Sequence, residues 1–407
     1  MTVRPTRRAK RKVCIIVASR ASYARIKSVL RAVDAHPHLE LQLVVGASAL
    51  LHRFGKVVDV VRQDGFDIHA TVYNIVEGEN PTTMAKSTGL AIIELATIFE
   101  NLRPDVVVTV ADRFETLGTA IAASYMNIPL AHTQGGEITG SIDESVRHAV
   151  TKLAHLHFPS TPRAAERLTS MGKDPDTVFL TGCPSIDAIS GIDLALPDDL
   201  FVRYGGVGAQ IDPRKPYLVV MQHPITTEYG QGEAQINETL NAIAQLRMQT
   251  VWLWPNVDAG SEDIAKGLRR FREKHNPDYI EFFRNFLVDD YARLIYHAAC
   301  LVGNSSSAIR EGAFLGVPSV NIGTRQQGRE RGENVMDVGC SAEEIARAIR
   351  VQIAHGRYPS NPLYGDGRAA ERIVKVLAEC EFTIQKRLAY GGDAVAGLGS
   401  HSGASGF

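Results

Sequence analysis

The chain has 407 residues, of which 44% are hydrophobic and 22% are charged, and its formal net charge is −1. This length exceeds what a single hydrophobic core usually serves, so two domains are expected. The near-neutral charge argues against a protein that works mainly by holding nucleic acid. No apolar run approaches the ~20 residues that cross a membrane, and no signal peptide follows the basic start, which predicts a cytoplasmic protein.

The two ends of the chain differ in composition from the rest. Residues 1–12 carry six Lys and Arg side chains and are predicted to form a disordered basic arm, with contact to nucleic acid or a membrane surface as the alternative. Residues 390–407 are rich in Gly and Ser and are predicted to be a disordered tail. The five cysteines are scattered without a C-x-x-C pair and no H-E-x-x-H motif is present, so no metal site is predicted.

Short apolar runs alternate with amphipathic segments along most of the chain. Because the runs are continuously apolar, both faces of each strand should be buried, as in parallel sheets covered by helices. The unit repeats after a Pro- and Gly-containing break at 187–215, which predicts an α/β fold of two Rossmann-like domains. The predicted strands are 12–19, 39–46, 105–111, 128–133, 157–160, 178–182, 217–222, 250–255, 279–284, 300–304 and 318–323, and the clearest helices are 23–36, 83–102 and 164–172.

Polar side chains follow the carboxyl ends of six predicted strands. Ligands of parallel α/β sheets bind at that edge, so these side chains are predicted to converge on one site between the domains. Strand ends need turn residues in any case, and each position taken alone is compatible with an ordinary turn. The residues are Arg20, Asp112, Arg113, Gln134, Glu137, His223, Ser305 to Ser307, Thr324 and Arg325.

Three of these residues are arginines, whose forked guanidinium suits contact with phosphate. Surface ion pairing is the alternative for each of Arg20, Arg113 and Arg325. His223 precedes Pro224, which fixes the turn and can aim the imidazole at a ligand, but a purely structural histidine fits the pattern as well.

The segment GNSSSAIREGAFLG at 303–316 is the predicted phosphate cradle. A strand ends there and a helix begins at the serines, so free backbone N–H groups and the positive end of the helix dipole face the site. A plain serine N-cap is the alternative. Glu311, two turns further on, can accept from a ribose diol or lie on the helix surface. Neither G-x-G-x-x-G after the first strand nor a P-loop motif is present, which removes the main support for a nicotinamide dehydrogenase or a P-loop enzyme.

The segment LAHTQGGEITGSIDESVRHAVTKLAH at 130–155 combines a helix start with an unusual density of polar groups. Ser141 and Glu144 have the spacing of a capping box. On the helix that follows, Asp143 and Arg147 are i,i+4 neighbours, as are Glu144 and His148. The cap does not account for the upstream sequence from Gln134 to Glu137, whose two glycines allow a tight turn beside a ligand.

Eight segments carry a family pattern: SRASYARIK, ADRFETL, HTQGGEITGSIDESVRHAVTKLAH, GCPSID, QHPITTE, PNVDAGS, GNSSSAIREGAFLGVPSVNIGTRQQGRERGENV and YGDGRAAERI. Their order resembles that of the hydrolysing UDP-N-acetylglucosamine 2-epimerases, which include bacterial enzymes of sialic-acid-type pathways and the epimerase half of the bifunctional animal enzyme. The resemblance runs from about Lys12 to Leu377.

This resemblance implies a GT-B-like fold, in which two Rossmann-like domains with parallel sheets enclose an active-site cleft. Residues 13–188 would form the first domain together with a C-terminal helix at about 366–386, and residues 189–365 the second, UDP-binding domain. The implied reaction converts UDP-N-acetylglucosamine and water into N-acetylmannosamine and UDP, by anti elimination to 2-acetamidoglucal and then hydration with inversion at C2. The resemblance implies no redox cofactor, a UDP-sugar as the ligand, and a homodimer or homotetramer.

Family roles carry over to the matching positions of this chain. The resemblance implies that UDP is bound by Arg20, Arg113, Ser305, Ser306, Glu311 and Arg325. It implies that the sugar-side and catalytic set is Asp112, Glu137, Asp143, Glu144, Arg147 and His223. Removal of a C2 proton that no strong group acidifies requires a close carboxylate base, and departure of UDP requires cations and N–H donors.

The chain departs from the family pattern at two positions. Ser22 replaces a usual Asp, and Gln134 stands where many members have a Glu with an acid/base role. A neutral amide cannot accept the proton at pH 7. We therefore expect Gln134 to hydrogen-bond the sugar, with Asp112 and Glu137 as the acid/base candidates.

Four alternatives remain at this stage. The same chemistry on UDP-2,4-diacetamido-2,4,6-trideoxyglucose is the first, and a non-hydrolysing epimerase that keeps UDP on its product is the second. The same two-domain scaffold also serves glycosyltransferases, which would transfer the sugar to an added acceptor. A non-catalytic UDP-sugar sensor would bind UDP without hydrogen exchange at C2.

Overall fold

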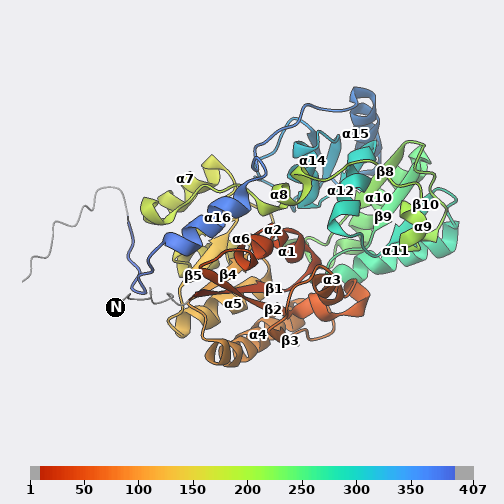
Figure 1. Cartoon of the computed structure of the whole chain (residues 1–407). Helices are drawn as coiled ribbons and strands as arrows, with labels where there is room; N and C mark the ends of the chain where they lie inside the picture. Colours follow the sequence, from red (N-terminus) through yellow and green to blue (C-terminus); the bar gives the residue numbers. More distant parts are fainter. Residues whose placement is uncertain (1–9, 390–407) are drawn as a thin grey trace, which may run out of the picture.

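The computed structural model describes residues 10–389, which form two sheets with helices on both faces of each (Figure 1). The first sheet has the order β3-β2-β1-β4-β5-β6, and every neighbouring pair is parallel. Its strands are β1 (Arg11–Val17), β2 (Leu39–Gly46), β3 (Ala70–Val72), β4 (Val106–Val110), β5 (Leu130–Thr133) and β6 (Leu156–Phe158).

The second sheet has the order β13-β12-β11-β8-β9-β10-β7 and is parallel except for β7, which runs antiparallel to β10. Its strands are β7 (Val207–Gly208), β8 (Tyr217–Met221), β9 (Gln249–Leu253), β10 (Ile280–Phe283), β11 (Cys300–Gly303), β12 (Ser319–Ile322) and β13 (Val335–Val338). The two Rossmann-like α/β halves are those that the sequence patterns predict, and their arrangement is the GT-B-like fold that the family resemblance implies.

Alternation along the central strands explains why helices cover both faces. In β1, Val13 and Ile15 enter one apolar core while Cys14 and Ile16 enter the core on the opposite face. β8 behaves in the same way, because odd and even residues enter different cores of the second half. Both faces of each sheet are therefore covered by apolar cores that exclude water. Ligands can reach these sheets only at the strand ends.

The helices connect successive strands within each half. Those of the first half are α1 (Arg20–Ala24), α2 (Lys27–Asp34), α3 (Val57–Gln63), α4 (Pro81–Leu102), α5 (Phe114–Tyr125), α6 (Asp143–Leu153) and α7 (Pro162–Ser170). They are followed by α8 (Pro184–Ser190), α9 (Leu200–Tyr204), α10 (Gly232–Leu246), α11 (Ser261–His275), α12 (Val288–His297), α13 (Ser306–Ile309), α14 (Glu311–Phe314), α15 (Ala342–His355) and α16 (Ala369–Glu379). No helix among the described residues is long and apolar enough to span a bilayer.

The structure differs from the sequence prediction at three places. The predicted helix 23–36 is interrupted, since α1 ends at Ala24 and α2 begins at Lys27. The predicted strand 178–182 forms only a bridge at Val178, although the N–H group of Phe179 donates to His157 in β6 and that of Thr181 to Pro159 just after it. The strands β3, β7 and β13 were not predicted, because short edge strands lack a long apolar run.

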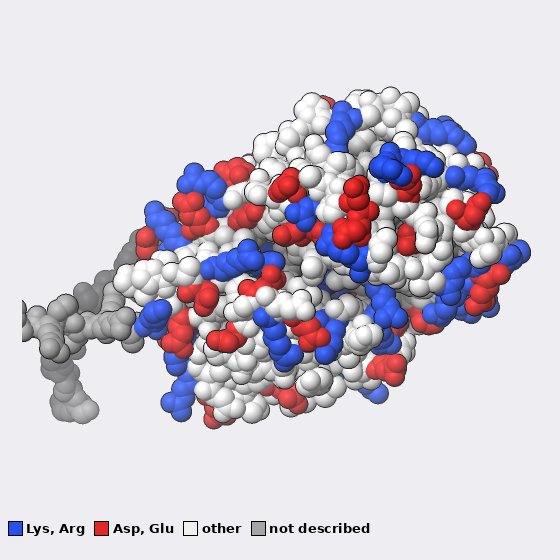
Figure 2. All heavy atoms as spheres, turned by 45° about the vertical axis from the view of Figure 1, so that its right-hand side comes forward, with Lys and Arg blue, Asp and Glu red and all other residues white. Residues whose placement is uncertain are grey.

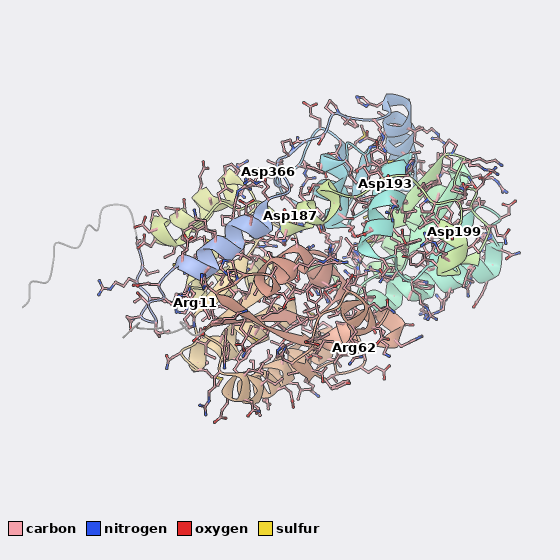
Figure 3. The ribbon with its side chains drawn as sticks, in the orientation of Figure 1. Arg11, Arg62, Asp187, Asp193, Asp199 and Asp366 are labelled. Carbon is pink, nitrogen blue, oxygen red and sulfur yellow. The ribbon has the colours of Figure 1, made fainter. Side chains whose placement is uncertain are left out.

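The last helix returns to the first sheet. Apolar side chains of α16, among them Ile373 and Leu377, are buried in the core around β1 and β2. Asp187 of α8 accepts the first N–H groups of α16, from Ala369 at 2.9 Å and Ala370 at 2.6 Å (Figure 3). A carboxylate at this end caps the helix and favours its dipole.

The structure describes only residues 10–12 of the predicted basic arm and none of the predicted tail. β1 already begins at Arg11, inside the segment predicted to be a basic arm, and the Arg11 guanidinium donates to the carbonyls of Leu377 and Cys380. Residues 1–9 and the predicted tail 390–407 lie outside the described residues. The division into domains at residue 188 stays a prediction.

Candidate active site

A cavity with an open volume of about 1000 Å³ lies between the two sheets and receives residues from the strand ends of both. Figure 2 shows Lys and Arg side chains on both sides of the junction between the two halves. Ten of the predicted site residues line the cavity: Arg20, Asp112, Arg113, Asp143, His223, Ser305, Ser306, Ser307, Glu311 and Arg325.

Arginines from both halves form the cationic side of this cavity. Arg20 at the start of α1 reaches across to the second half, where it donates to the Arg284 carbonyl at 2.9 Å and to Asn285 Oδ1 at 3.0 Å. Arg113 pairs with Asp258 at 2.8 Å and Glu115 at 3.2 Å. Ion pairing, the alternative considered from sequence, therefore does hold for Arg113, but within the cavity wall and not at the surface.

Sequence reasoning missed Arg25, which also lines the cavity. It lies at the break between α1 and α2 and donates to Ser306 Oγ at 2.8 Å. The motif SRASYARIK contains Arg25 as its second arginine. The predicted continuous helix did not indicate that this side chain points into the cavity. The interruption after Ala24 places Arg25 beside Ser305 to Ser307 of the other half, a segment called the serine loop below.

The serine loop follows β11 and supports both sequence interpretations. Ser305 Oγ accepts the Ser307 N–H at 3.4 Å, so a serine cap is present. The loop also lines the cavity, and Ser307 Oγ lies 2.6 Å from the hydroxyl of Tyr291, which was not predicted. Glu311 begins the separate helix α14, so the prediction that it lies two turns into one helix is wrong. Its Oε2 atom is buried and accepts no hydrogen bond from the described residues.

His223 is a neutral donor in this environment. Its Nδ1 atom accepts the Asn256 N–H at 3.2 Å, which leaves the proton on Nε2. Burial, and then the nearby Arg325 and Arg20, hold the pKa of His223 well below its usual value. The imidazole can therefore donate a hydrogen bond to an anion without carrying charge.

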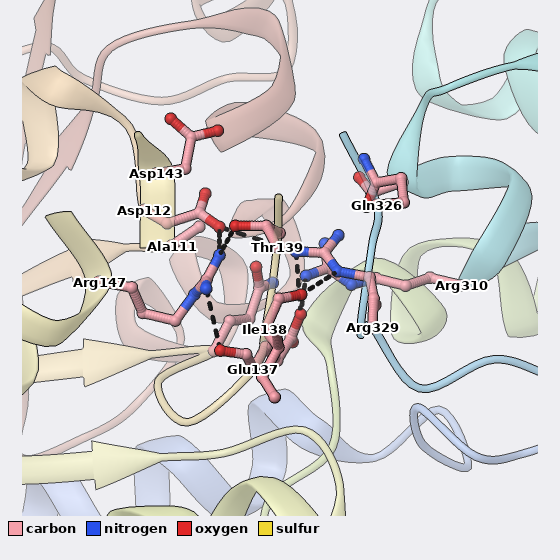
Figure 4. A network of polar contacts seen from close by, with 12 residues as sticks. Ala111, Asp112, Glu137, Ile138, Thr139, Asp143, Arg147, Arg310, Gln326 and Arg329 are labelled. Atoms are coloured by element: carbon pink, nitrogen blue, oxygen red, sulfur yellow. Dashed lines mark hydrogen bonds and ion pairs between the residues drawn. The ribbon is translucent and has the colours of Figure 1, made fainter. Parts of the chain in front are cut away.

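Asp112 follows β4 and is held as a carboxylate. Its Oδ2 atom forms a close ion pair with Arg147 of α6 and lies 3.7 Å from Arg329 (Figure 4). Burial alone would raise the pKa of Asp112, but the guanidiniums of Arg147, Arg25 and Arg329 outweigh it and hold the pKa far below the usual value. Asp112 is thus a permanent negative charge in the cavity wall.

The backbone before Asp112 is strained. Ala111 has a φ of 62°, in the left-handed region that favours glycine. Its carbonyl accepts a hydrogen bond at 2.7 Å from Nε2 of His132, a buried histidine on the neighbouring strand β5. Strain of this kind is found where surrounding structure fixes a functional side chain, and here it directs Asp112 to the cavity.

Asp143 is the first residue of α6 and behaves differently from Asp112. Burial, and then the negative charge of Asp112, raise the pKa of Asp143 to about 6. Its closest cation is Arg325, at 3.9 Å. The predicted Asp143–Arg147 pair is wrong, because Arg147 turns inward to Asp112 and Glu144. Two carboxylates of the cavity therefore have opposite pKa shifts.

The predicted capping box at the start of α6 is also wrong. Ser141 Oγ accepts the Asp143 N–H at 3.4 Å, but Glu144 Oε2 accepts the Thr139 N–H at 2.8 Å and binds Arg147. The predicted Glu144–His148 pair does form, at 2.9 Å. Glu144 thus holds the loop before α6 and orients Arg147, and neither Glu144 nor Arg147 lines the cavity.

Glu137 lies behind the cavity wall and not among its lining residues. It forms a close ion pair with Arg310 and lies 3.4 Å from Arg329, so it joins the first half of the chain to the second (Figure 4). Burial raises the pKa of Glu137, but Arg310 and Arg329 outweigh it and lower the pKa. The glycines before it turn beside α7: a Cβ on Gly136 would lie 2.1 Å from the Ala164 carbonyl oxygen. The predicted turn beside a ligand is therefore a turn beside a helix.

Gln134, like Glu137, is buried and does not line the cavity. Its Nε2 atom donates to Cys183 Sγ at 3.1 Å, and its Oε1 atom accepts no hydrogen bond from the described residues. Its φ of 62° is again left-handed. Cys183 Sγ in turn lies 3.1 Å from Ser185 Oγ, and Ser185 lines the cavity, so Gln134 touches the site only through this chain of contacts.

The chain is similar in sequence to known 2-epimerases over most of its length. The UDP-N-acetylglucosamine 2-epimerase family profile matches residues 31–378. The UDP-N,N'-diacetylbacillosamine 2-epimerase (hydrolyzing) of Legionella pneumophila is 31% identical over 90% of this chain and 95% of its own. The UDP-N-acetylglucosamine 2-epimerase of Neisseria meningitidis is 29% identical over 90% of this chain and 95% of its own.

The fold is also that of a solved enzyme. The UDP-GlcNAc 2-epimerase of Methanocaldococcus jannaschii, in complex with UDP-GlcNAc and UDP, has a TM-score of 0.75 at 17% identity, over 90% of this chain and 99% of its own. Together with the profile match, which spans most of the chain, these likenesses identify the chain as a member of the UDP-N-acetylglucosamine 2-epimerase family.

Proposed function

We propose that this protein is a cytoplasmic, hydrolysing UDP-N-acetylglucosamine 2-epimerase that releases N-acetylmannosamine and UDP. The observation that carries the proposal is a single cavity with cationic and hydroxyl groups from both halves and two carboxylates of opposite pKa shift. Family membership supplies the reaction class. Release of free UDP is supported by the name of the Legionella relative.

The cationic side of the cavity suits the leaving UDP. This side contains the serine loop and the guanidinium groups of Arg20, Arg25 and Arg325. Their positive charges stabilise the negative charge that develops on UDP as the C1–O bond breaks. The neutral His223 adds an N–H donor. The unpartnered Glu311 oxygen suits a ribose hydroxyl, which is a donor, and not a phosphate.

The two carboxylates suit different tasks in the elimination. A base removes the C2 proton, the C–H electrons form the C1=C2 bond, and UDP departs with the C1–O electrons. Asp143, with a pKa of about 6, is ionised at neutral pH and basic enough to accept that proton. Asp112 stays negatively charged throughout. It can stabilise the positive charge that develops at C1, first as UDP leaves and then as water adds.

This assignment differs from the one made on sequence alone, which favoured Asp112 and Glu137. Glu137 lies behind the wall and is occupied by two guanidiniums, and Asp112 is too acidic to hold a proton near pH 7. We assign Glu137 to joining the two halves and Asp143 to proton transfer.

The pH dependence of kcat/KM tests this assignment. Below about pH 6 the Asp143 carboxyl of the free enzyme is neutral and cannot accept the C2 proton; above that value it is ionised. We expect kcat/KM to rise about tenfold per pH unit below 6 and to level off above it. Initial rates of UDP release between pH 5 and 8 measure the profile, and a flat profile across pH 6 contradicts the assignment.

Replacing Gln134 by Glu tests whether the missing family carboxylate limits this enzyme. The new carboxyl would lie beside Cys183, where burial raises the pKa of an acid and outweighs the opposing charge of Arg310, so we expect it to stay neutral. We expect Gln134→Glu to leave kcat unchanged or lower it by less than about tenfold. A substantial gain in kcat would show that position 134 carries the proton. Gln134→Met, of similar size and uncharged, is the matched control.

A second substrate is favoured by one specific observation, the name of the Legionella relative. The chemistry at C1 and C2 is the same in UDP-N,N'-diacetylbacillosamine, which differs at C4 and C6. Incubation with each UDP-sugar in D₂O, followed by proton NMR, decides between them. A free 2-epimerised sugar deuterated at C2 identifies the substrate, whereas a persistent UDP-sugar with exchange at C2 identifies a non-hydrolysing enzyme. Transfer to an added acceptor would identify a glycosyltransferase.

A further inference from the structure

Three lysine side chains converge where helix α6 ends, and they are called the lysine cluster below. Lys152 lies in the last turn of α6, Lys173 follows α7, and Lys386 belongs to the segment after α16. The Nζ atoms of Lys173 and Lys386 both donate to the Lys152 carbonyl, that of Lys173 at 3.3 Å. Lys386 also donates to the Ala154 carbonyl at 2.6 Å. Two amines on one carbonyl oxygen are close neighbours, so their charges interact strongly.

No carboxylate pairs with the lysine cluster within residues 10–389. The lysines described there that do form ion pairs with carboxylates are Lys27, Lys56 and Lys266. The other titratable neighbours of the cluster are His155 and His157, and burial, followed by the charges of the lysines, lowers the pKa of both, so they are neutral near pH 7. The carbonyl end of a helix carries roughly −0.5 of an elementary charge, which one ammonium group already balances.

The lysine cluster therefore contains an amine that loses its proton near neutral pH. Burial, and then the charge of Lys173, lower the pKa of Lys386 to about 7. Burial, and then the charge of Lys152, lower the pKa of Lys173 to about 8. Lys173 is buried, whereas Lys386 is half-buried, so Lys386 is the amine that a small molecule can reach. A neutral amine activated by burial and by a neighbouring cation is a nucleophile.

Contacts on both sides of Lys386 hold it in this position. Before it, Nε2 of His155 lies 3.2 Å from the carbonyl oxygen of Ile384. After it, the Ala389 N–H donates to the Gly172 carbonyl at 3.0 Å. The segment 384–389 is thus fixed on the first half of the chain, which keeps the Lys386 amine beside the other two lysines.

The charge of the product decides which electrophile this amine suits. A protonated imine, formed with an aldehyde, would leave three positive charges together. An amide, formed with an acyl donor, is neutral and would leave two. A carbamate, formed with carbon dioxide, is an anion, so it would place one negative charge between two cations. Carbon dioxide is also small enough to reach a half-buried amine.

We propose that Lys386 is a carbon dioxide site, at which its amine forms a carbamate that the ammonium groups of Lys152 and Lys173 hold. The nitrogen lone pair attacks the carbon of carbon dioxide, one C=O electron pair moves to oxygen as the negative charge, and the nitrogen releases a proton to water. The remaining N–H can still donate to the Ala154 carbonyl. This site is separate from the proposed function, because Asp143 lies at the other end of α6, about 14 Å along the helix axis.

Trapping of the carbamate on the full chain tests the proposal without any use of enzyme activity. Protein equilibrated with carbon-13 bicarbonate should show a carbamate signal by carbon-13 NMR that is lost in Lys386→Arg, which separates it from the signal of the α-amino group. The Lys386 signal should grow between pH 6 and pH 8, as the amine loses its proton. Alkylation by a trialkyloxonium salt, followed by peptide mass spectrometry, should place the carbamate on Lys386. Lys375, exposed on α16, is the control amine and should stay unmodified.

Removal of a neighbouring cation gives the sharper test. Lys173→Met should lower the carbamate occupancy of Lys386 at pH 7 at least about threefold, because the pKa of the amine rises and the carbamate loses one partner. Lys375→Met is the matched control and should leave the occupancy unchanged. Absence of a carbamate on Lys386, or equal occupancy in Lys173→Met, overturns the proposal. Acetylation of Lys386 by acetyl phosphate without any carbamate would overturn the assignment to carbon dioxide. Circular dichroism confirms that each variant is folded.

Discussion

Replacing Asp143 by Asn is expected to lower kcat by about 10²- to 10⁴-fold, the usual contribution of a positioned acid or base. The amide has nearly the same size and keeps the start of α6, but it cannot accept the C2 proton. KM should change by less than about threefold, because the substitution leaves Arg20 and Arg25 in place and Asp143 lies only at the edge of contact with Arg325, at 3.9 Å. Exchange of the C2 hydrogen with D₂O, followed by proton NMR, should fall together with UDP release.

Asp112→Asn is the matched comparison for this prediction. It should also lower kcat, since it removes the charge that stabilises positive charge at C1. Because the negative charge of Asp112 raises the pKa of Asp143, the residual activity should still rise with pH, but the rise should move below pH 6. Asp143→Asn should lose that rise. If Asp143→Asn retains both turnover and the pH dependence, the proton acceptor lies elsewhere, and Glu137→Gln becomes the next variant to measure.

Replacing Arg310 by Met is expected to lower the free energy of unfolding by about 3–5 kcal/mol, the usual cost of removing one partner of a buried ion pair. Arg310 and Glu137 are both almost fully buried and come from different halves of the chain. The variant removes the closest cation of the Glu137 carboxylate and leaves Arg329, 3.4 Å away, as its remaining partner, so the cost should lie at the lower end of this range. Urea denaturation followed by fluorescence measures the change. Limited proteolysis should show earlier cleavage between the two halves.

The double variant Glu137→Gln with Arg310→Met provides the control. It removes both charges, so it should be more stable than Arg310→Met alone. Arg368→Met, which breaks an exposed pair with Glu371 at the start of α16, should cost less than about 1 kcal/mol. Equal effects of the buried and exposed substitutions would show that the Glu137–Arg310 pair does not hold the halves together.

Local sequence patterns predicted much of the fold. Continuously apolar runs predicted nearly all the central strands, because burial on both faces removes the need for polar alternation. The long helix α4 was predicted within two residues of its start, and its actual start is set by Asn80, which caps Thr83, and by Pro81. Edge strands such as β7, with two residues, carry no such pattern and were missed.

The sequence predicted only part of the candidate site. The rule that parallel sheets bind ligands at their carboxyl ends brought Arg20, Asp112, His223 and Arg325 together correctly. It also placed Glu137 at the ligand, because a strand-end position does not show which way the side chain points. Arg25 was missed for the opposite reason, since a helix break that sequence did not indicate turns it into the cavity.

The sequence by itself determined the layers, the family and the set of residues from which a site could be built, because hydrophobic periodicity and motif spacing are local properties. Only the tertiary structure decided the protonation and the partners of those residues. Asp112 and Asp143 are the same residue type on neighbouring elements, yet one contacts Arg147 and stays charged while the other faces Asp112 and titrates near pH 6. Electrostatic free energy depends on distances and burial across the whole fold, and the Glu137–Arg310 pair joins residues 173 positions apart.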